Sequence, residues 1–228
     1  MSATPLPIAV LASGEGTNLQ ALLDAQRESR LPITVVGVFG DKPAARALER
    51  ARRCGVVAEA IEPRAYSDRA SYDEALFARV ASVAPGLVVC AGYMRLISAA
   101  IVEHWVGRMI NIHPSLLPKY QGLRTHQRAL AAGDREHGAS VHFVTPELDG
   151  GPVVSRVVVE VREHDTPEAL AHRLLPHEHR LLLATIALIA RRYVTATPLG
   201  ITIDGRLLHE PLTLAPDDYL YDAAGFVA

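Results

Sequence analysis

The stretch "IAVLASGEGTNLQALL", residues 8–23, decides the expected fold. It opens with an apolar run typical of a buried strand, expected at residues 8–12. Gly14 and Gly16 then separate this run from a helical pattern, expected at residues 17–29, in which leucines recur at spacings of three and four. A strand, a glycine turn and an amphipathic helix in this order predict the first βα unit of a sheet.

The same alternation of apolar runs and helical patterns continues toward the middle of the chain. Further strands are expected at residues 33–39, 56–61, 87–91 and 109–112, and further helices at 44–53, 68–83 and 98–105. The strands are continuous Val, Ile and Leu runs, as in parallel strands buried on both faces. This predicts an α/β fold with an open, doubly wound, mostly parallel sheet, Rossmann-like in its N-terminal half. Ligands of such sheets bind beyond the carboxyl ends of the strands.

The pattern changes after residue 135. Strands are expected at residues 139–145 and 152–161, joined by a hairpin-like turn, "PELDGG". A long helix is expected from about 166 to 192, kinked or split at Pro176, and then a final antiparallel strand pair. We expect one domain over residues 1–228. Its expected parts are an N-terminal half (about 7–110), a C-terminal half (about 111–210) and a tail (211–228).

Bulk composition limits the classes of partner. The chain has 228 residues and a formal net charge of -2, and 21% of its residues are charged, so it is globular and has no excess of positive charge for nucleic acid. The N-terminus lacks a signal-peptide pattern, and the apolar stretch at residues 181–190 is half the roughly 20 residues that span a bilayer. Cys54 and Cys90 are far apart in sequence, which fits free thiols in a reducing compartment. We expect a cytoplasmic protein that binds neither nucleic acid nor membrane.

The glycine turn predicts an anion site. The backbone N–H groups of Gly16, Thr17 and Asn18 begin the first helix, and a helix start favours phosphate. Leu19 stands where a dinucleotide fingerprint has its third glycine, whereas Asp41 keeps an NAD-dependent oxidoreductase open as an alternative. A turn that binds nothing is the other alternative.

Polar residues at the end of the strand at 109–112 predict chemistry. Asn111 and His113 project from the same face of the strand, and Pro114 favours an extended backbone at His113. An amide and an imidazole on one face can donate to one developing oxyanion. Asp149 precedes two glycines and is by default a turn residue. If it lies beside His113, we expect its charge to raise the pKa of the imidazole. A structural histidine beside a turn is the alternative.

The remaining histidines do not predict a metal site. His177 and His179 fall on opposite sides of a helix, and no HExxH motif occurs in the sequence. We therefore expect no metal.

Several long motifs carry a resemblance to a known family. They are "VLASGEGTNLQALLDA", "LVVCAGYMRLIS", "MINIHPSLLPKYQGLRTHQRAL", "GDREHGASVHFVTPELDGGPVV" and "HEHRLLL". In these stretches the chain resembles the glycinamide ribonucleotide formyltransferases, a folate-dependent formyltransferase family of purine biosynthesis. The resemblance implies transfer of a formyl group from the co-substrate 10-formyltetrahydrofolate to the amine of glycinamide ribonucleotide.

The resemblance also implies that the N-terminal half (about 7–110) binds the nucleotide and that the C-terminal half (about 111–210) is the folate and catalytic half. It further implies roles for individual residues. It gives Asn111, His113 and Asp149 as the catalytic residues. Glycinamide ribonucleotide is expected on Gly16, Thr17, Asn18 and Glu178. The folate is expected on Arg69, Met94, Arg95, Leu96, Ile97, Val102, Asn111, Thr145, Pro146, Glu147 and Leu148.

Two prolines depart from the pattern of the family. Pro176 puts the placement of Glu178 in question, and Pro146 stiffens a loop that is mobile in relatives. Other folate enzymes remain alternatives: a formyltetrahydrofolate hydrolase, which would carry an additional N-terminal domain, or a methionyl-tRNA formyltransferase, which would carry an additional C-terminal one. A non-catalytic nucleotide-binding module is a further alternative, and the resemblance leaves a homodimer open.

Overall fold

The computed structural model describes residues 4–192, 194–197 and 200–225. The chain divides into two compact units, Met1–Asn111 and Ile112–Ala228. We call these the first and the second unit and describe each by itself. The expectation that they form one domain stays a prediction.

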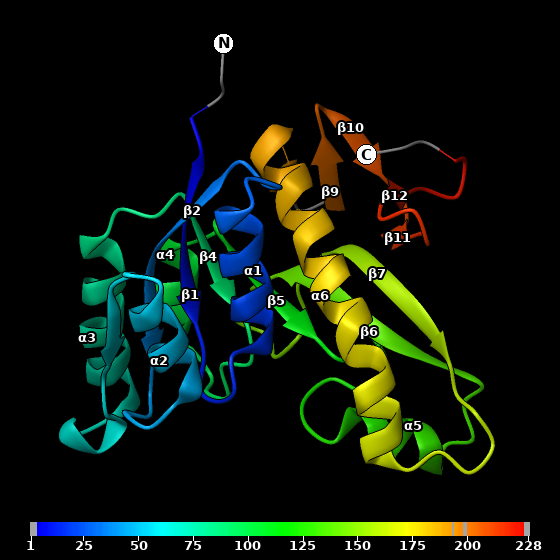
Figure 1. Ribbon diagram of the computed structural model, residues 1–228, viewed down its shortest axis with the longest axis horizontal. Helices are drawn as coiled ribbons and strands as arrows, with labels where there is room; N and C mark the ends of the chain where they lie inside the picture. Colours follow the sequence, from blue (N-terminus) through cyan, green and yellow to red (C-terminus); the bar gives the residue numbers. More distant parts are fainter. Residues whose placement is uncertain (1–3, 193, 198–199, 226–228) are drawn as a thin grey trace. The chain divides into compact units, whose positions relative to one another are not determined.

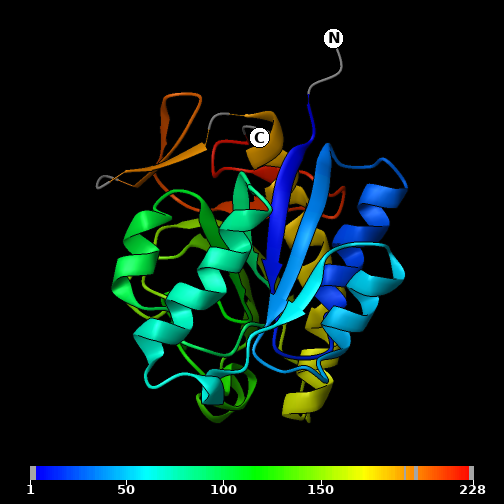
Figure 2. The same ribbon diagram turned by 90° about the vertical axis from the view of Figure 1, so that its left-hand side faces the viewer.

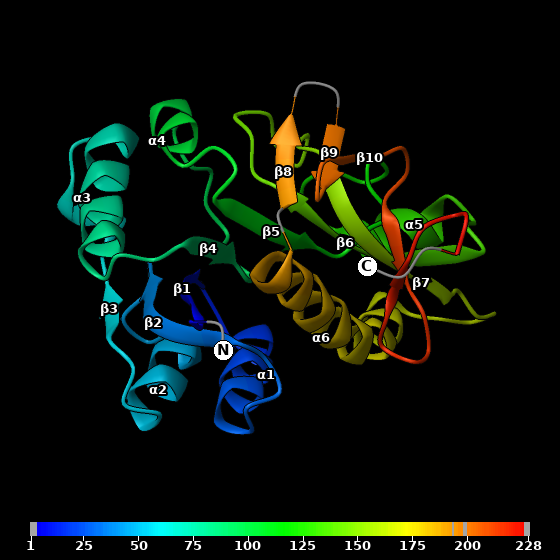
Figure 3. The ribbon, with the colours of Figure 1, turned by 90° about the horizontal axis from the view of Figure 1, so that it is seen from above.

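The first unit is a parallel sheet with helices on both faces. Its strands are β1 (Leu6–Leu11), β2 (Ile33–Gly40), β3 (Ala58–Ala60), β4 (Leu87–Cys90) and the start of β5 (Met109–His113). They lie in the order β5-β4-β1-β2-β3, and every neighbouring pair is parallel. The helices are α1 (Thr17–Arg27), α2 (Arg46–Arg53), the 3₁₀ turn η1 (Pro63–Ala65), α3 (Arg69–Ser82) and α4 (Ala99–His104). Figures 2 and 3 show α1 and α2 on one face of the strands and α3 and α4 on the other. The predicted doubly wound sheet is confirmed.

Burial explains why the apolar runs became strands. Ile8, Val10 and Leu11 of β1 are 0% exposed, as expected for a central strand covered on both faces. Leu19 and Leu22 of α1 are also 0% exposed, so the apolar face read from the sequence packs inward.

The second unit is built around an antiparallel pair. Its main strands are β6 (Glu136–Phe143) and β7 (Val153–Glu160), with Ala139 opposite Val157. Two helices accompany them, α5 (Thr125–Ala131) and α6 (Pro167–Arg191). Figure 1 shows α6 running along β6 and β7, and it contacts both strands.

The end of the chain holds more strand than the sequence indicated. β8 (Val194–Thr197), β9 (Gly200–Ile203) and β10 (Arg206–Leu208) form a separate antiparallel sheet. In the expected tail, β11 (Leu212–Leu214) pairs parallel with β7, and β12 (Leu220–Tyr221) pairs antiparallel with β11. β11 and β12 are three and two residues long, too short for a clear alternating pattern. Residues 226–228 of the tail lie outside the described residues.

Of the kink or split expected at Pro176, the split is wrong, and the kink stays a prediction. α6 is assigned as one helix of 25 residues with Pro176 inside it. Leu170 and Leu174 on one side of the proline and Leu181 and Leu182 on the other are all 0% exposed. Burial on both sides holds the helix together across the missing N–H.

Within the described ranges, no helix combines the length and the apolar character that a membrane crossing requires.

Candidate active site

The glycine turn between β1 and α1, in the first unit, presents backbone N–H groups rather than side chains. Gly16 is the N-cap of α1 and has a φ of 70°, in the left-handed region, with no side-chain cap. A Cβ at Gly16 would lie 2.7 Å from Cα of Ala47, so only glycine fits. Thr17 and Asn18 follow in the first helical turn, whose N–H groups have no intrahelical acceptor. This is the geometry of an anion site at a helix start.

Glu15 lies between the two glycines of the turn, but its carboxylate is neutralised by an arginine. Its side chain is 65% exposed and pairs with Arg46 at 3.0 Å, and Arg50 donates to its carbonyl oxygen at 2.8 Å. The Glu15 carboxylate is therefore exposed to solvent and paired with Arg46.

The segment Met94–Ile97 follows β4 and is held at both ends. The Met94 N–H donates to Oγ of Ser13 at 3.0 Å, and the Ser98 N–H donates to Oδ2 of Asp73 at 2.7 Å. Met94 and Leu96 expose 65% and 53% of their surface. Fixed backbone beside exposed apolar side chains can bind a flat, hydrogen-bonding ring system.

The side chains of Arg69, Arg95 and Val102, which are also expected to bind the folate, differ in their surroundings in the first unit. Arg69 is exposed at the start of α3, and the guanidinium of Arg95 lies over the Tyr72 ring at 5.1 Å. Val102 of α4 is only 2% exposed, so its side chain belongs to the core.

In the second unit, the structure brings His113 and Asp149 together. Nδ1 of His113 lies 3.4 Å from Oδ2 of Asp149, and the two side chains are 8% and 10% exposed. Nε2 of His113 lies 3.0 Å from the carbonyl oxygen of Tyr120, and that oxygen can only accept. Nε2 therefore carries a proton, and Nδ1 faces the carboxylate. We call these two side chains the imidazole–carboxylate pair.

Two further groups hold Asp149. The Gly122 N–H donates to its Oδ2 at 2.9 Å, and Nε2 of His142 lies 3.6 Å from its Oδ1. Burial by itself raises the pKa of Asp149, but the hydrogen bonds from His142 and Gly122, with the charge of His113, outweigh it and hold that pKa below its ordinary value. Asp149 is therefore ionised at neutral pH.

The expectation that the pKa of His113 is raised is wrong. Burial lowers the pKa of His113, and the Tyr120 carbonyl and the Asp149 carboxylate, which both act to raise it, do not compensate. The sequence indicated the charged neighbour but not the loss of water around the ring. Without a ligand, the pair holds a carboxylate and a mostly neutral imidazole at pH 7.

Sequence reasoning missed the residues that surround the pair. Ser140 and His142 lie on one face of β6 and are 1% and 2% exposed. Oγ of Ser140 donates to the Ser115 carbonyl at 2.8 Å and accepts from the Leu117 N–H at 3.1 Å, which ties the loop after His113 to β6. Two polar residues at i and i+2 in the otherwise apolar end of β6, residues 139–143, were the signal available.

The remaining predicted residues lie on a loop and a helix of the second unit. The loop after β6 exposes Pro146, Glu147 and Leu148, while Thr145 is partly buried and its Oγ1 lies 3.5 Å from the Glu147 carbonyl oxygen. Glu178 is partly buried on α6, two residues after Pro176.

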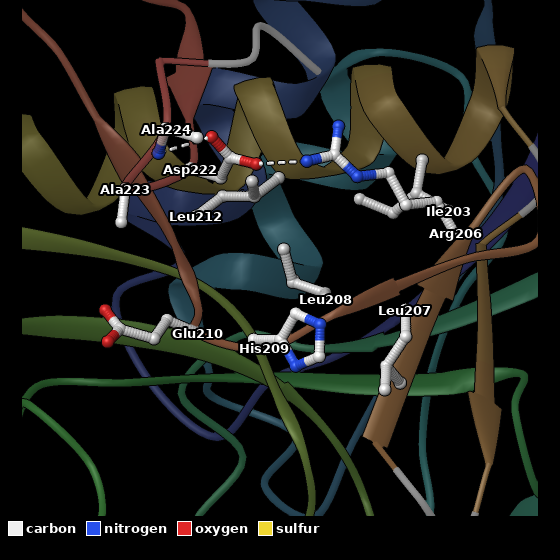
Figure 4. Close-up of a pocket in the computed structure, with 10 residues that line it drawn as sticks. All are labelled: Ile203, Arg206, Leu207, Leu208, His209, Glu210, Leu212, Asp222, Ala223 and Ala224. Carbon is white, nitrogen blue, oxygen red and sulfur yellow. Dashed lines mark hydrogen bonds and ion pairs between the residues drawn. The ribbon is translucent and has the colours of Figure 1, made fainter.

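The described residues contain no cluster of three or more His, Cys, Asp or Glu side chains that could hold a metal ion. A hollow of about 220 Å³ lies near the C-terminal end (Figure 4). Its lining includes Leu207, Leu208 and Leu212, with Arg206 paired to Asp222 at 3.1 Å. None of the predicted site residues lines it.

Comparison with known proteins gives a consistent family. Residues 6–186 match the family described as "Formyl transferase". A phosphoribosylglycinamide formyltransferase of Escherichia coli (strain K12) is 46% identical over 183 residues, which make up 80% of this chain and 86% of that protein. The trifunctional purine biosynthetic protein adenosine-3 of Bos taurus is 37% identical over 183 residues, 80% of this chain and 18% of that protein. The solved phosphoribosylglycinamide formyltransferase of Coxiella burnetii has a TM-score of 0.85 at 40% identity, covering 90% of this chain and 96% of that chain.

Proposed function

Because the chain belongs to the formyl transferase family, we propose that it transfers a formyl group from 10-formyltetrahydrofolate to the amine of glycinamide ribonucleotide in de novo purine biosynthesis. The observation that carries this proposal is the buried imidazole–carboxylate pair at the end of β5. The similarity to phosphoribosylglycinamide formyltransferases supports the choice of both substrates.

The reaction needs a stabilised oxyanion and a route for one proton. The amine nitrogen attacks the formyl carbon, the bond from that carbon to the folate nitrogen breaks, and the proton lost by the amine ends on the folate nitrogen. Asn111 lies on the same face of β5 as His113 and would donate to the oxygen that becomes negative, and a positive charge on the His113 ring would stabilise that oxygen.

The protonation states of the pair fit this role. Negative charge developing near the ring raises the pKa of His113, so the imidazolium forms as the oxyanion forms. A proton arriving on Nδ1 gains a carboxylate acceptor, because Asp149 is already ionised and 3.4 Å away. Asp149 therefore stabilises the charged ring and can help to pass the proton from amine to folate.

The two substrates call for different surfaces. The phosphate of the ribonucleotide would bind the N–H groups of Gly16, Thr17 and Asn18, with Glu178 contacting the ribose or the amine. The folate ring would use the backbone of Met94–Ile97, and the loop from Thr145 to Leu148 would border it.

The test is an absorbance assay of folate deformylation, run with and without glycinamide ribonucleotide. We expect tetrahydrofolate to be released only when the amine is present. Release without the amine would make the protein a hydrolase, and no release in either case would refute formyl chemistry. His113→Ala serves as the background control.

A further inference from the structure

One loop touches both members of the imidazole–carboxylate pair. This loop, residues 119–122, places the Tyr120 carbonyl 3.0 Å from Nε2 of His113 and the Gly122 N–H 2.9 Å from Oδ2 of Asp149. Nε2 of Gln121 also donates to the Asp149 backbone carbonyl at 3.2 Å. The position of this loop therefore sets the direction of the ring and the distance between the two side chains.

The backbone of the loop does not hold this position by itself. Tyr120 has a φ of 57°, a left-handed conformation that bulky residues rarely adopt. A carbonyl on such a residue keeps its direction only if other contacts fix the residue. Ser115 fixes the neighbouring Lys119 by donating from Oγ to its carbonyl at 2.6 Å, and the side chain of Tyr120 supplies further contacts.

Asp134, in the turn between α5 and β6, makes those contacts. Its Oδ2 accepts from the Tyr120 hydroxyl at 2.7 Å, and its Oδ1 accepts from Nζ of Lys119 at 3.0 Å. One carboxylate thus holds two consecutive side chains of the loop. The guanidinium of Arg128 lies over the Tyr120 ring at 5.1 Å and donates to the Gln121 carbonyl at 2.5 Å, which supports the loop from α5.

The charge of Asp134 is suited to this task. The hydrogen bonds from Tyr120 and Lys119 hold the pKa of Asp134 below its ordinary value, so it is ionised at neutral pH. Its side chain is 18% exposed, whereas that of Lys119 is 61% exposed. The bond from the Tyr120 hydroxyl is partly buried, whereas the bond from Lys119 is exposed.

We propose that Asp134 is a positioning residue for the formyl transfer of the proposed function: by holding Lys119 and Tyr120, it directs the Tyr120 carbonyl at Nε2 of His113 and keeps Nδ1 facing Asp149. Asp134 itself makes no hydrogen bond to the His113 ring. Its effect passes through the loop, so it acts on the chemical step rather than on ribonucleotide binding.

A merely structural role for Asp134 predicts a different result. In that case its loss lowers the melting temperature but leaves the ring and the turnover of the folded protein unchanged. Asp165 is a suitable comparison, because it also locks a turn, accepting from the Arg162 N–H at 2.8 Å and from Arg173 at 2.7 Å. None of these contacts leads to His113.

The experiment compares Asp134→Ala, Asp134→Asn, Tyr120→Phe and the control Asp165→Ala in the full chain. The first readout is the ring N–H proton of His113 in nitrogen-edited NMR spectra, and the second is kcat and KM for formyl transfer. We expect Asp134→Ala to lose the slowly exchanging N–H signal and to lower kcat by up to about 100-fold with little change in KM for glycinamide ribonucleotide. Asp134→Asn keeps an acceptor for the Tyr120 hydroxyl and should recover part of both.

The outcomes distinguish a positioning role of Asp134 from a merely structural one. Tyr120→Phe should weaken the N–H signal and kcat less than Asp134→Ala, and it tests the same contact if Asp134→Ala does not fold. If both variants keep the signal and kcat of the wild type, or if Asp165→Ala changes them equally, Asp134 is not a positioning residue. The NMR readout needs no substrate, so it still decides the role of Asp134 if the wild type fails to transfer formyl groups.

Discussion

The glycine turn of the first unit and the imidazole–carboxylate pair of the second unit are built in opposite ways. The turn uses backbone N–H groups from consecutive residues, with Gly16 fitted against Ala47. The pair uses side chains from separate segments, held by Tyr120, Gly122 and His142. A local motif is enough for the first, whereas the second exists only when strand and loops are assembled.

This difference says which changes each site tolerates. Backbone donors remain when side chains change, so the turn fails only where a side chain takes the space or forces another conformation. The pair fails when one side chain or its orientation is lost. The four predictions that follow test this contrast, from the largest expected effect to the smallest.

The largest effect is expected at the pair. His113→Ala and Asp149→Asn should each lower kcat by about 10³-fold, because each removes stabilisation of the developing oxyanion. The affinity for glycinamide ribonucleotide should stay near that of the wild type, since the proposed phosphate site is the glycine turn and not the pair. Steady-state kinetics and calorimetric titration measure the two quantities. His172→Ala, an exposed change on α6, is the control. Near-normal turnover in His113→Ala would mean that the assigned mechanism is wrong.

The next effect is expected at the turn. Gly16→Val places a Cβ 2.7 Å from Ala47 in a left-handed backbone, which should cost roughly 4 kcal/mol in stability from overpacking and strain together. Ribonucleotide affinity should fall as well, because the N–H groups shift. Thermal unfolding and calorimetry report both. At Gly14 an added Cβ meets nothing within 4 Å, so Gly14→Ala should leave stability unchanged. Equal affinity in Gly16→Val and wild type would contradict the phosphate assignment.

A third effect should appear as a pH dependence of stability in the second unit. His137 is 1% exposed and lies 3.0 Å from Nδ1 of His126. Burial, with the charge of His126, lowers the pKa of His137 to about 4. The unfolded chain therefore takes up this proton first, near pH 6.5, so stability falls as the pH falls from 6.5 to 4. The loss should be about 3 kcal/mol between pH 7 and pH 4.

Urea unfolding of wild type and His137→Gln at several pH values measures this contribution. The variant should start less stable at pH 7 but lose less stability toward pH 4. Parallel curves for the two proteins would show that the His137 proton does not contribute.

The smallest effect is expected at the cap of α6. Thr166 accepts from the Ala169 N–H at 3.2 Å, and Thr166→Ala should cost about 1 kcal/mol of stability. Turnover should not change, because the cap has no contact with the pair. Thr166→Ser keeps the cap oxygen and should keep most of the stability. If Thr166→Ser loses as much as Thr166→Ala in chemical denaturation, the cap bond is not the cause.

The sequence was informative where structure is local. Apolar runs predicted β1, β2 and β4, and the spacing of leucines predicted α1, because one apolar residue in each turn is enough to define a buried face. It was less informative at β11, which pairs with the distant strand β7, and at β12, which pairs with β11, because both strands are very short. The split expected at Pro176 also failed, since the packing of four leucines outweighs one missing hydrogen bond.

By itself, the sequence determined the parallel sheet, the glycine turn and the order of the polar residues along β5, because strand alternation and glycine conformation depend on neighbours in the chain. Only the tertiary structure decided that Asp149 meets His113, that burial lowers the pKa of the imidazole, and that Asp134 holds the loop between them. The physical reason is that distance, desolvation and hydrogen bonding between separate segments arise only when the chain has folded.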